Sequence, residues 1–533
     1  MKLLSSINYA TQHASNRQGY LLGIEMFPFF KREVEAGVFT PPSIGTRGVS
    51  ESDIGSATDI SSATETDFNI AVNGGTPVLV SLVVAGLDTG FAIAAALESS
   101  INDALVAAGQ RGRVEVKFDD GLAQYSIYSL NTGGNSSVVV TEGDGLKTVL
   151  SLGETETVGT YSEDYAFVKT AGFNFSQEIE MSEHRSGRQA SNFFRKKKMV
   201  EGDTTLYVLL GDEGSPVAMS DAHKLLYESC FGRKVVDTPT ELTFDCSQPH
   251  NVYFSALINN NGLGQTINGA YAKNWSLSLA GEAPANLSIS SKARDSKMAS
   301  ISQIGVGASG VTSIETVAGE AKRFEKDSVV MIVASDGVTV SHGGEGDLKV
   351  VSVDDSTNTV VLSEAVTVQK DGFIAPWSPA YFGGIPEDSL RVATDLEGSV
   401  SLDGGTTSIG EITAAEVSVE NNLTDLDNYY GADSNVGFVD GSRQEITCNL
   451  TLNLTVEEMR RIQQMKDFET FNVLIRVGGE SGQRMEIKMP RVIFNIPSLE
   501  LPAEGAVSLS FEGRALQTET GAMDAIQVSF KNA

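Results

Sequence analysis

Apolar and polar residues alternate with a period of two along many short stretches of this chain. The clearest stretch is 445–453, EITCNLTLN, in which Ile446, Cys448 and Leu450 share one face. Such alternation is typical of a β-strand with one buried and one solvated face. The chain also holds 53 glycines but only 14 prolines. We therefore expect many short strands joined by turns.

Three stretches follow the helical period instead. The first carries Ile93, Leu97 and Ile101 on one face, spaced as in an amphipathic helix. The second opens with Ser220 or Asp221 as its N-cap, and the third opens at Thr455 with the Thr-x-x-Glu arrangement of a capping box. The expected helices cover residues 91–108, 220–230 and 455–465.

The end of the chain repeats its middle. The segment WSLSLAGEAPANLSISSKAR, 275–294, aligns without a gap on NIPSLELPAEGAVSLSFEGR, 495–514. The period is far too long for a solenoid, so the repetition predicts two copies of one β-rich domain. The aligned positions are Leu279 with Leu499, Leu287–Ser290 with Val507–Ser510, Arg294 with Arg514 and, upstream, Phe173 with Val417 and Phe175 with Val419.

Two further segments look like separate modules. In the first, the turn Asn73–Gly75 lies between alternating runs and predicts a hairpin. In the second, Asp354–Asn358 is a hairpin connection between VVSV and VVL. The expected divisions are 1–64 (N-terminal segment contributing to the first copy), 65–160 (inserted ββαββ module), 161–300 (first copy), 301–375 (small all-β module) and 376–533 (second copy).

The fold class that follows is mainly β (α+β). It consists of two duplicated β-sandwich or barrel domains, each with one short helix, and two inserted small β-rich modules. At 533 residues the chain is long enough for each of these parts to bury a core of its own.

The formal net charge is −30. Such a charge keeps a protein soluble and repels nucleic acids and anionic membranes from its acidic surfaces. Cys230, Cys246 and Cys448 fit no metal-ligand spacing, as is usual for buried cysteines in a reducing compartment. No apolar stretch reaches the roughly 18 residues of a membrane span, and the N-terminus lacks a signal-peptide core. We expect cytoplasmic synthesis and no membrane partner.

A search for catalytic and metal motifs gives none. The five histidines lie outside any HExxH pattern, and the chain has no GxSxG or P-loop. The acidic runs VDDSTNT and DLDNYYGAD lack the spacing of a calcium loop. We therefore expect no catalytic residue, no metal and no cofactor.

A basic segment, His184–Lys198, is the strongest local anomaly in charge. It contains no acidic residue, although the chain has 69 of them. Three interpretations are open: docking onto an acidic neighbour, which we favour, a solvated surface loop, or nucleic-acid binding with two phenylalanines as stacking groups. The candidate contact residues are Arg185, Arg188, Phe193, Phe194, Arg195, Lys196, Lys197 and Lys198.

The corresponding loop of the second copy, 423–442, is acidic. A basic and an acidic loop at equivalent places would fix the register of neighbouring subunits by charge complementarity. The alternative is two unrelated solvated loops. The candidate residues are Asp425, Asp427, Asp433 and Asp440, with Tyr429 and Tyr430 at the centre of the loop.

The stretches VSVENNLTD…GSRQEITCNLTLNL and MPRVIFNIPSLELPAEGAVSLSFEGRA resemble the second half of siphophage tail tube proteins. The order strand, long loop, strand, helix and four strands in both copies is similar to that family, one group of which is a fused double repeat. The segment FNIAVNGG…TGGNSSVVVT resembles small decoration domains of flagellins and phage tail proteins.

This resemblance implies a structural virion protein. Three chains would form a pseudo-sixfold ring, and rings would stack into a hollow tube through the long basic loop. The implied partners are a tape-measure protein and genomic DNA in the lumen, and tail terminator and baseplate proteins at the ends. The implied location is the virion tail, assembled in the host cytoplasm. An acidic lumen would let DNA slide without sticking.

Two other functions stay open at this stage. A baseplate or receptor-binding tail protein would use the two extra modules to bind a host surface glycan. An enzyme such as a surface-associated hydrolase is the remaining alternative, without support from any motif.

Overall fold

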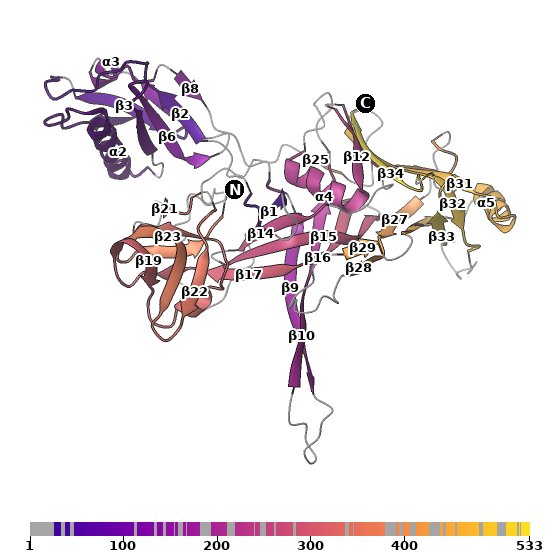
Figure 1. The fold of residues 1–533 in the computed structure, drawn as a ribbon. Helices are drawn as coiled ribbons and strands as arrows, with labels where there is room; N and C mark the ends of the chain where they lie inside the picture. The colour runs from indigo at the N-terminus through magenta and orange to yellow at the C-terminus, as the bar shows by residue number, and fades with distance from the viewer. Residues whose placement is uncertain are drawn as a thin grey trace, which may run out of the picture.

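We describe the protein from a computed structural model, shown in Figure 1. The structure describes residues 26–33, 38–42, 47–64, 66–110, 114–132, 136–141, 145–153, 155–157, 164–166, 168–181, 193–210, 219–238, 240–245, 252–260, 263–280, 284–335, 340–344, 346–378, 391–393, 398–405, 412–425, 438–440, 444–453, 456–478, 483–497, 508–519, 522 and 524–532.

The body of the protein is one 16-stranded sheet, so the prediction of a mainly β fold is confirmed. Its main path runs in the order β12-β13-β34-β32-β33-β30-β27-β15-β16-β10-β9. These strands are β9 (Val168–Met181), β10 (Phe193–Tyr207), β12 (Arg233–Asp237), β13 (Glu241–Asp245), β15 (Leu263–Ala280), β16 (Asn286–Ala293), β27 (Ile412–Glu420), β30 (Glu445–Asn453), β32 (Gln483–Phe494), β33 (Ser508–Ala515) and β34 (Gln527–Asn532).

The remaining strands of the sheet attach beside this path. On the first half of β15, β14 pairs with one edge and β17 with the other, and β1 pairs with β14. On β32, β31 and β34 pair in the same way, and β26 pairs with β31. They are β1 (Met26–Arg32), β14 (Phe254–Asn260), β17 (Asp295–Ser300), β26 (Ser399–Ser401) and β31 (Phe471–Val477).

The same order of pairing therefore occurs twice. The first set contains β1, β9, β10, β14, β15, β16 and β17, and the second set contains β26, β27, β30, β31, β32, β33 and β34 in the same roles. Each set has one helix between its third and fourth strands in chain order, α4 (Asp221–Phe231) in the first and α5 (Val456–Lys466) in the second. We use the names first set and second set below.

The two sets also share an irregularity in register. β14 and β15 lose register between Phe254 and Ala256, and β31 and β32 lose it between Phe471 and Val473. When the two register irregularities are aligned, the pair Tyr271–Lys292 of the first set corresponds to the pair Ile493–Arg514 of the second set. This equivalence differs by two residues from the gapless sequence alignment, because Leu287 then corresponds to Leu509 and not to Val507.

The helices of both sets lie where the sequence predicted them. Ser220 caps α4, because its Oγ accepts a hydrogen bond from the His223 amide at 3.3 Å. The helix ends before Gly232, whose φ of 90° suits a glycine. Helix α5 is confirmed as well, whereas its predicted cap, Thr455, lies outside the described residues.

Residues 47–157 form a module with its own core, which we call the N-terminal module (Figure 1). Its predicted hairpin and helix are confirmed: β3 pairs with β4 around Asn73 and Gly74, both at positive φ, and Thr89 caps α2. Its sheets include β2, so they begin upstream of residue 65. The elements are β2 (Arg47–Glu51), β3 (Asp67–Val72), β4 (Val78–Ser81), α2 (Gly90–Ala107), β5 (Val114–Asp119), β6 (Gln124–Thr132), β7 (Val138–Thr141), α3 (Leu146–Val149) and β8 (Thr155–Thr157).

Helix α2 is, among the described residues, the one helix that length and composition would allow to cross a membrane. Its apolar face packs instead into the core of the N-terminal module, where Ile93, Leu97 and Ile101 are fully buried. These are the residues that the helical period placed on one face, so the apolar stripe of α2 is explained by packing.

Residues 302–376 form a second all-β module, which we call the central module. The turn between β22 and β23 is confirmed, because Asp354 Oδ1 accepts from the Ser356 amide at 2.9 Å and Asn358 has a φ of 55°. The elements are β18 (Ser302–Gln303), β19 (Ala308–Glu315), η2 (Ala321–Arg323), β20 (Val330–Val333), β21 (Val340–His342), β22 (Val350–Asp354), β23 (Thr359–Val368) and β24 (Phe373–Pro376).

Candidate assembly surfaces

The two sets are joined by direct strand pairing. β15 of the first set pairs with β27 of the second, from Asn274 opposite Glu420 to Ala280 opposite Ala414. The side chains of Leu277 and Val417 face the core and are at most 1% exposed. The core of the body therefore runs without a break from one set to the other.

A hairpin makes a second connection between the sets. β12 and β13 follow α4 in the chain, but β13 pairs with β34 of the second set, from Glu241 opposite Lys531 to Asp245 opposite Gln527. Beneath this pairing, the Tyr227 ring of α4 stacks on the Phe530 ring with centroids 5.0 Å apart. The second set has no counterpart of this hairpin, since β31 begins at Phe471, soon after α5 ends at Lys466.

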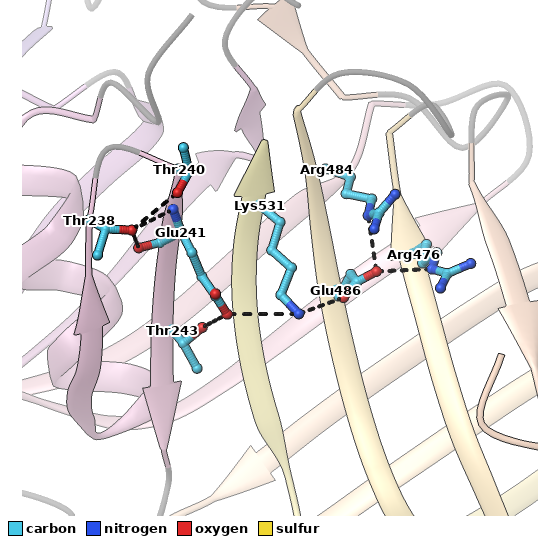
Figure 2. A network of polar contacts seen from close by, with 8 residues as sticks. All are labelled: Thr238, Thr240, Glu241, Thr243, Arg476, Arg484, Glu486 and Lys531. Atoms are coloured by element: carbon cyan, nitrogen blue, oxygen red, sulfur yellow. Dashed lines mark hydrogen bonds and ion pairs between the residues drawn. The ribbon is translucent and has the colours of Figure 1, made fainter. Parts of the chain in front are cut away.

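A row of charges crosses this second connection, as Figure 2 shows. Lys531 Nζ lies 3.7 Å from Glu241 Oε1 and 3.2 Å from Glu486 Oε2. Glu486 Oε1 also contacts the Nε atoms of Arg476 and Arg484, each at 3.0 Å. Burial opposes the ionisation of Glu486, but the hydrogen bonds and charges of Lys531, Arg484 and Arg476 outweigh it and lower the pKa of this carboxyl.

The sheet face opposite the helices is polar across both sets. The alternation that buries Leu277, Val417 and Leu450 turns their neighbours outward. Ser278, Glu416, Asn449 and Glu512 form one row across four adjacent strands. The charged residues on this face of β9, β10, β16, β27, β30 and β33 include Glu201, Asp203, Glu416, Glu420, Glu445 and Glu512, and also Lys169, Lys292 and Arg514.

β9 ends the path of the sheet. Within the described part of the chain it pairs with β10 alone. Its counterpart in the second set, β27, pairs on both edges, with β30 and with β15. Figure 1 shows β9 and β10 projecting from the body as a long hairpin, whereas β27 lies within the body.

Of the predicted basic segment, residues 193–198 are described, and they begin β10 at the end of the hairpin away from the body. Phe193 and Phe194 are paired with Met181 and Glu180, and the register shifts between Arg195 and Lys198. Lys196 and Lys197 fall within that shift. Arg185 and Arg188 lie outside the described residues.

The predicted acidic loop is described only at its ends. Asp425 closes β28 (Leu423–Asp425), which pairs with β29 (Phe438–Asp440) as a separate two-stranded sheet. Asp427, Tyr429, Tyr430 and Asp433 lie outside the described residues. The structure therefore places the two charged segments on different elements and does not test a contact between them.

The buried reactive groups of the body have structural roles. Cys230 and Cys448 pack in its core, and burial raises the pKa of the Cys448 thiol to about 12, so it stays protonated at neutral pH. His223 Nδ1 lies 2.7 Å from the Ser220 hydroxyl at the start of α4. In the described ranges, no three His, Cys, Asp or Glu side chains gather in a way that would hold a metal ion.

The hairpin β12–β13 is not among the elements predicted from the sequence. Its signal is present as VVDTPTELTF, two apolar runs around a Thr-Pro-Thr turn. The pairing with β34, almost 300 residues further on, has no local signal.

The geometry and the comparison with known families agree. The family model described as phage tail tube protein matches residues 145–515, which span most of both sets. The chain belongs to the phage tail tube protein family. It is thus a structural protein of the virion tail, as its resemblance to tail tube proteins implied.

Two further comparisons add little to this family assignment. A chain from the virion of a native gene transfer agent particle is similar, with 12% sequence identity and a TM-score of 0.19. The matched region covers 23% of the present chain and 93% of the gene transfer agent chain. No curated protein matches the sequence.

Proposed function

We propose that this protein is the major tube subunit of a phage tail, in which three chains close a pseudo-sixfold ring and rings stack into a hollow tube around a tape-measure protein. After the tape-measure protein leaves, the tube conducts DNA. Each chain contributes its first and second sets as two copies of one tube domain. Tail terminator and baseplate proteins would bind the ends of the tube, and assembly would take place in the host cytoplasm.

The pairing of β15 with β27 carries this proposal. It joins β15, at one end of the pairing order β9-β10-β16-β15 of the first set, to β27, the second set's counterpart of β9, so the two sets follow one another head to tail. The same step repeated between chains needs a free first strand and a free end on the second set. β9, which within the described residues pairs with β10 alone, would offer the first, and β32, the second set's counterpart of β15, would offer the second. A head-to-tail contact that closes on itself produces a ring.

The polar face of the sheet supports DNA conduction. When the sheets of neighbouring subunits close around a lumen, the face opposite the helices lines it. Acidic residues outnumber basic ones on this face, and Lys292 is itself paired with Glu201 at 3.4 Å. Because acidic residues are in excess on this face, there is little counterion release to hold DNA, so the lumen would repel DNA and let it slide.

The projecting hairpin supports stacking of the rings. It carries residues 193–198 of the basic segment away from the body, in a chain whose net charge is −30. A cationic projection that meets the acidic surface of the next ring would guide and orient the encounter.

Electron microscopy of the purified protein tests the proposed function. We expect hollow tubes built of stacked rings, and trimers by light scattering before polymerisation. Discrete trimers with affinity for host glycans would instead favour a baseplate or receptor-binding protein. A monomer that forms no higher assembly at any concentration would contradict the proposal.

A further inference from the structure

The connection after helix α5 exposes a strained aromatic residue. Phe468 has a φ of 59°, and its side chain is 78% exposed. The backbone is held there because the Phe468 amide donates to the Met465 carbonyl at 3.1 Å. The left-handed region is unfavourable for a bulky residue, and such strain is retained where a site requires it. Exposure and strain together point to a contact made outside the single chain.

The first set shows what this connection does. There, the chain after α4 forms the hairpin β12–β13, which leaves its own set and pairs with β34 of the second set. Phe244 of β13 lies edge-on to Phe530 with ring centroids 6.5 Å apart. The connection after the helix is therefore the element by which the first set reaches the next one. In the second set the equivalent connection is shorter and carries Phe468.

The surface that would receive Phe468 lies on β17, the counterpart of β34. The outer edge of β34 is filled by β13. The outer edge of β17 is met by its own chain, since Ala299 bridges to Phe324 and the Glu325 amide donates to the Met298 carbonyl at 3.1 Å. Glu325 Oε2 also accepts from the Met298 amide at 3.1 Å. The central module thus occupies the place that β13 occupies on β34.

An apolar side chain stays open at this seam. Met298 is 38% exposed although it lies within a paired strand. Figure 1 shows β17 and the central module at one end of the body, and α5 at the other end. The two surfaces are therefore arranged as the two sides of a head-to-tail contact.

We propose that Phe468 docks on the neighbouring chain, at the seam of β17 and the central module around Met298. The occupant of this seam is a second copy of the protein, so the inference rests on the proposed ring. The contact between the two sets of one chain then differs from the contact between two chains. Within a chain the hairpin β12–β13 pairs with β34, whereas between chains the Phe468 side chain makes the contact. A flexible methionine is well suited to receive an aromatic ring.

The variant Phe468→Gly tests the anchor, because glycine removes the ring and relieves the positive φ. We expect an unassembled protein with an unchanged or higher melting temperature. The protein concentration needed for tube formation should rise by about tenfold or more, as when an interface anchor is lost. Phe91→Ala is the matched control, since Phe91 is 63% exposed on the N-terminal module, and it should assemble normally.

A photo-crosslinking residue at position 468 tests the partner surface. In assembled tubes we expect crosslinks to residues 295–326 of a second chain. Crosslinks within the same chain, or to another surface, would overturn the inference, as would normal assembly of Phe468→Gly. If the wild-type protein forms no rings, the proposed function fails first; if it forms tubes that do not depend on Phe468, the function stands and this inference fails.

Discussion

Lys531 on the last strand and Glu241 on the hairpin β12–β13 form an ion pair across the two sets, with Nζ and Oε1 3.7 Å apart. The lysine also neutralises Glu486, which is only 8% exposed. We expect Lys531→Met to lower the free energy of unfolding by about 1 kcal/mol, because both contacts are partly solvated. Urea denaturation of the unassembled protein measures the change. Lys488→Met, an exposed position on β32, is the control and should have little effect.

The lowered pKa of Glu486 makes this seam sensitive to acid. A carboxyl whose pKa is lower in the folded state stabilises the protein above its unfolded pKa, near the ordinary value of 4.5, and loses this contribution as the pH falls through the folded pKa. We expect the melting temperature to fall below pH 4.5. The fall should be smaller in Glu486→Gln, so equal slopes for the two proteins would show that Glu486 has no part in it.

Two neighbouring glycines offer a sharp test of packing in the first set. A Cβ at Gly202 would lie 2.4 Å from the Phe173 ring on the paired strand, whereas one at Gly172 would meet no atom within 4 Å. We expect Gly202→Ala to destabilise the protein by about 1–3 kcal/mol through overpacking. Gly172→Ala should be neutral or slightly stabilising. Thermal denaturation of both variants checks the contrast, which equal effects would contradict.

The acidic face predicts how the tube treats DNA. Glu416 and Glu512 lie in one row of that face, on either side of Asn449. The double variant Glu416→Lys/Glu512→Lys should still form tubes but retain DNA, with an affinity that falls steeply as salt is added. Filter binding of short DNA to purified tubes measures this. Glu364→Lys, exposed on the central module, is the control; DNA retention by both proteins would place the lumen elsewhere.

The basic segment predicts how rings stack. Reversal of Lys196, Lys197 and Lys198 to Glu should prevent polymerisation and leave single rings, because the projecting hairpin would then repel an acidic neighbour. Circular dichroism checks that the variant is folded, and sedimentation separates rings from tubes. High salt should weaken wild-type stacking in the same direction. Tubes of normal length from the folded variant would refute the docking role.

Local pattern predicted the local elements of this protein. The alternation in 445–453 became β30, the helical period became α2, and Ser220 became the cap of α4. The pairing of β13 with β34 could not be predicted in this way, because the residues of a hairpin do not indicate which distant strand pairs with its outer edge. The gapless alignment was two residues off at Leu287, because a slip of two residues along a strand keeps the same apolar alternation.

The candidate contact residues were the charged residues of two loops and the aromatic residues inside those loops, so an apolar residue elsewhere was not considered. Phe468 escaped notice because an apolar residue after an amphipathic helix is normally part of the core. Its positive φ and its exposure are properties of the folded backbone. One sequence feature pointed to a difference between the two sets: the segment between α5 and β31 is shorter than the segment after α4, which forms the hairpin β12–β13.

The long hairpin β9–β10 belongs to one set and not to the other. In a ring where both sets occupy similar positions, projections therefore alternate with gaps. A ring with equal projections at every position could settle on the next one after a slip of half a subunit. In the proposed tube, this chain would allow only whole-subunit steps, and its duplication would then encode the rotational phase of one ring upon another along the whole length of the tail.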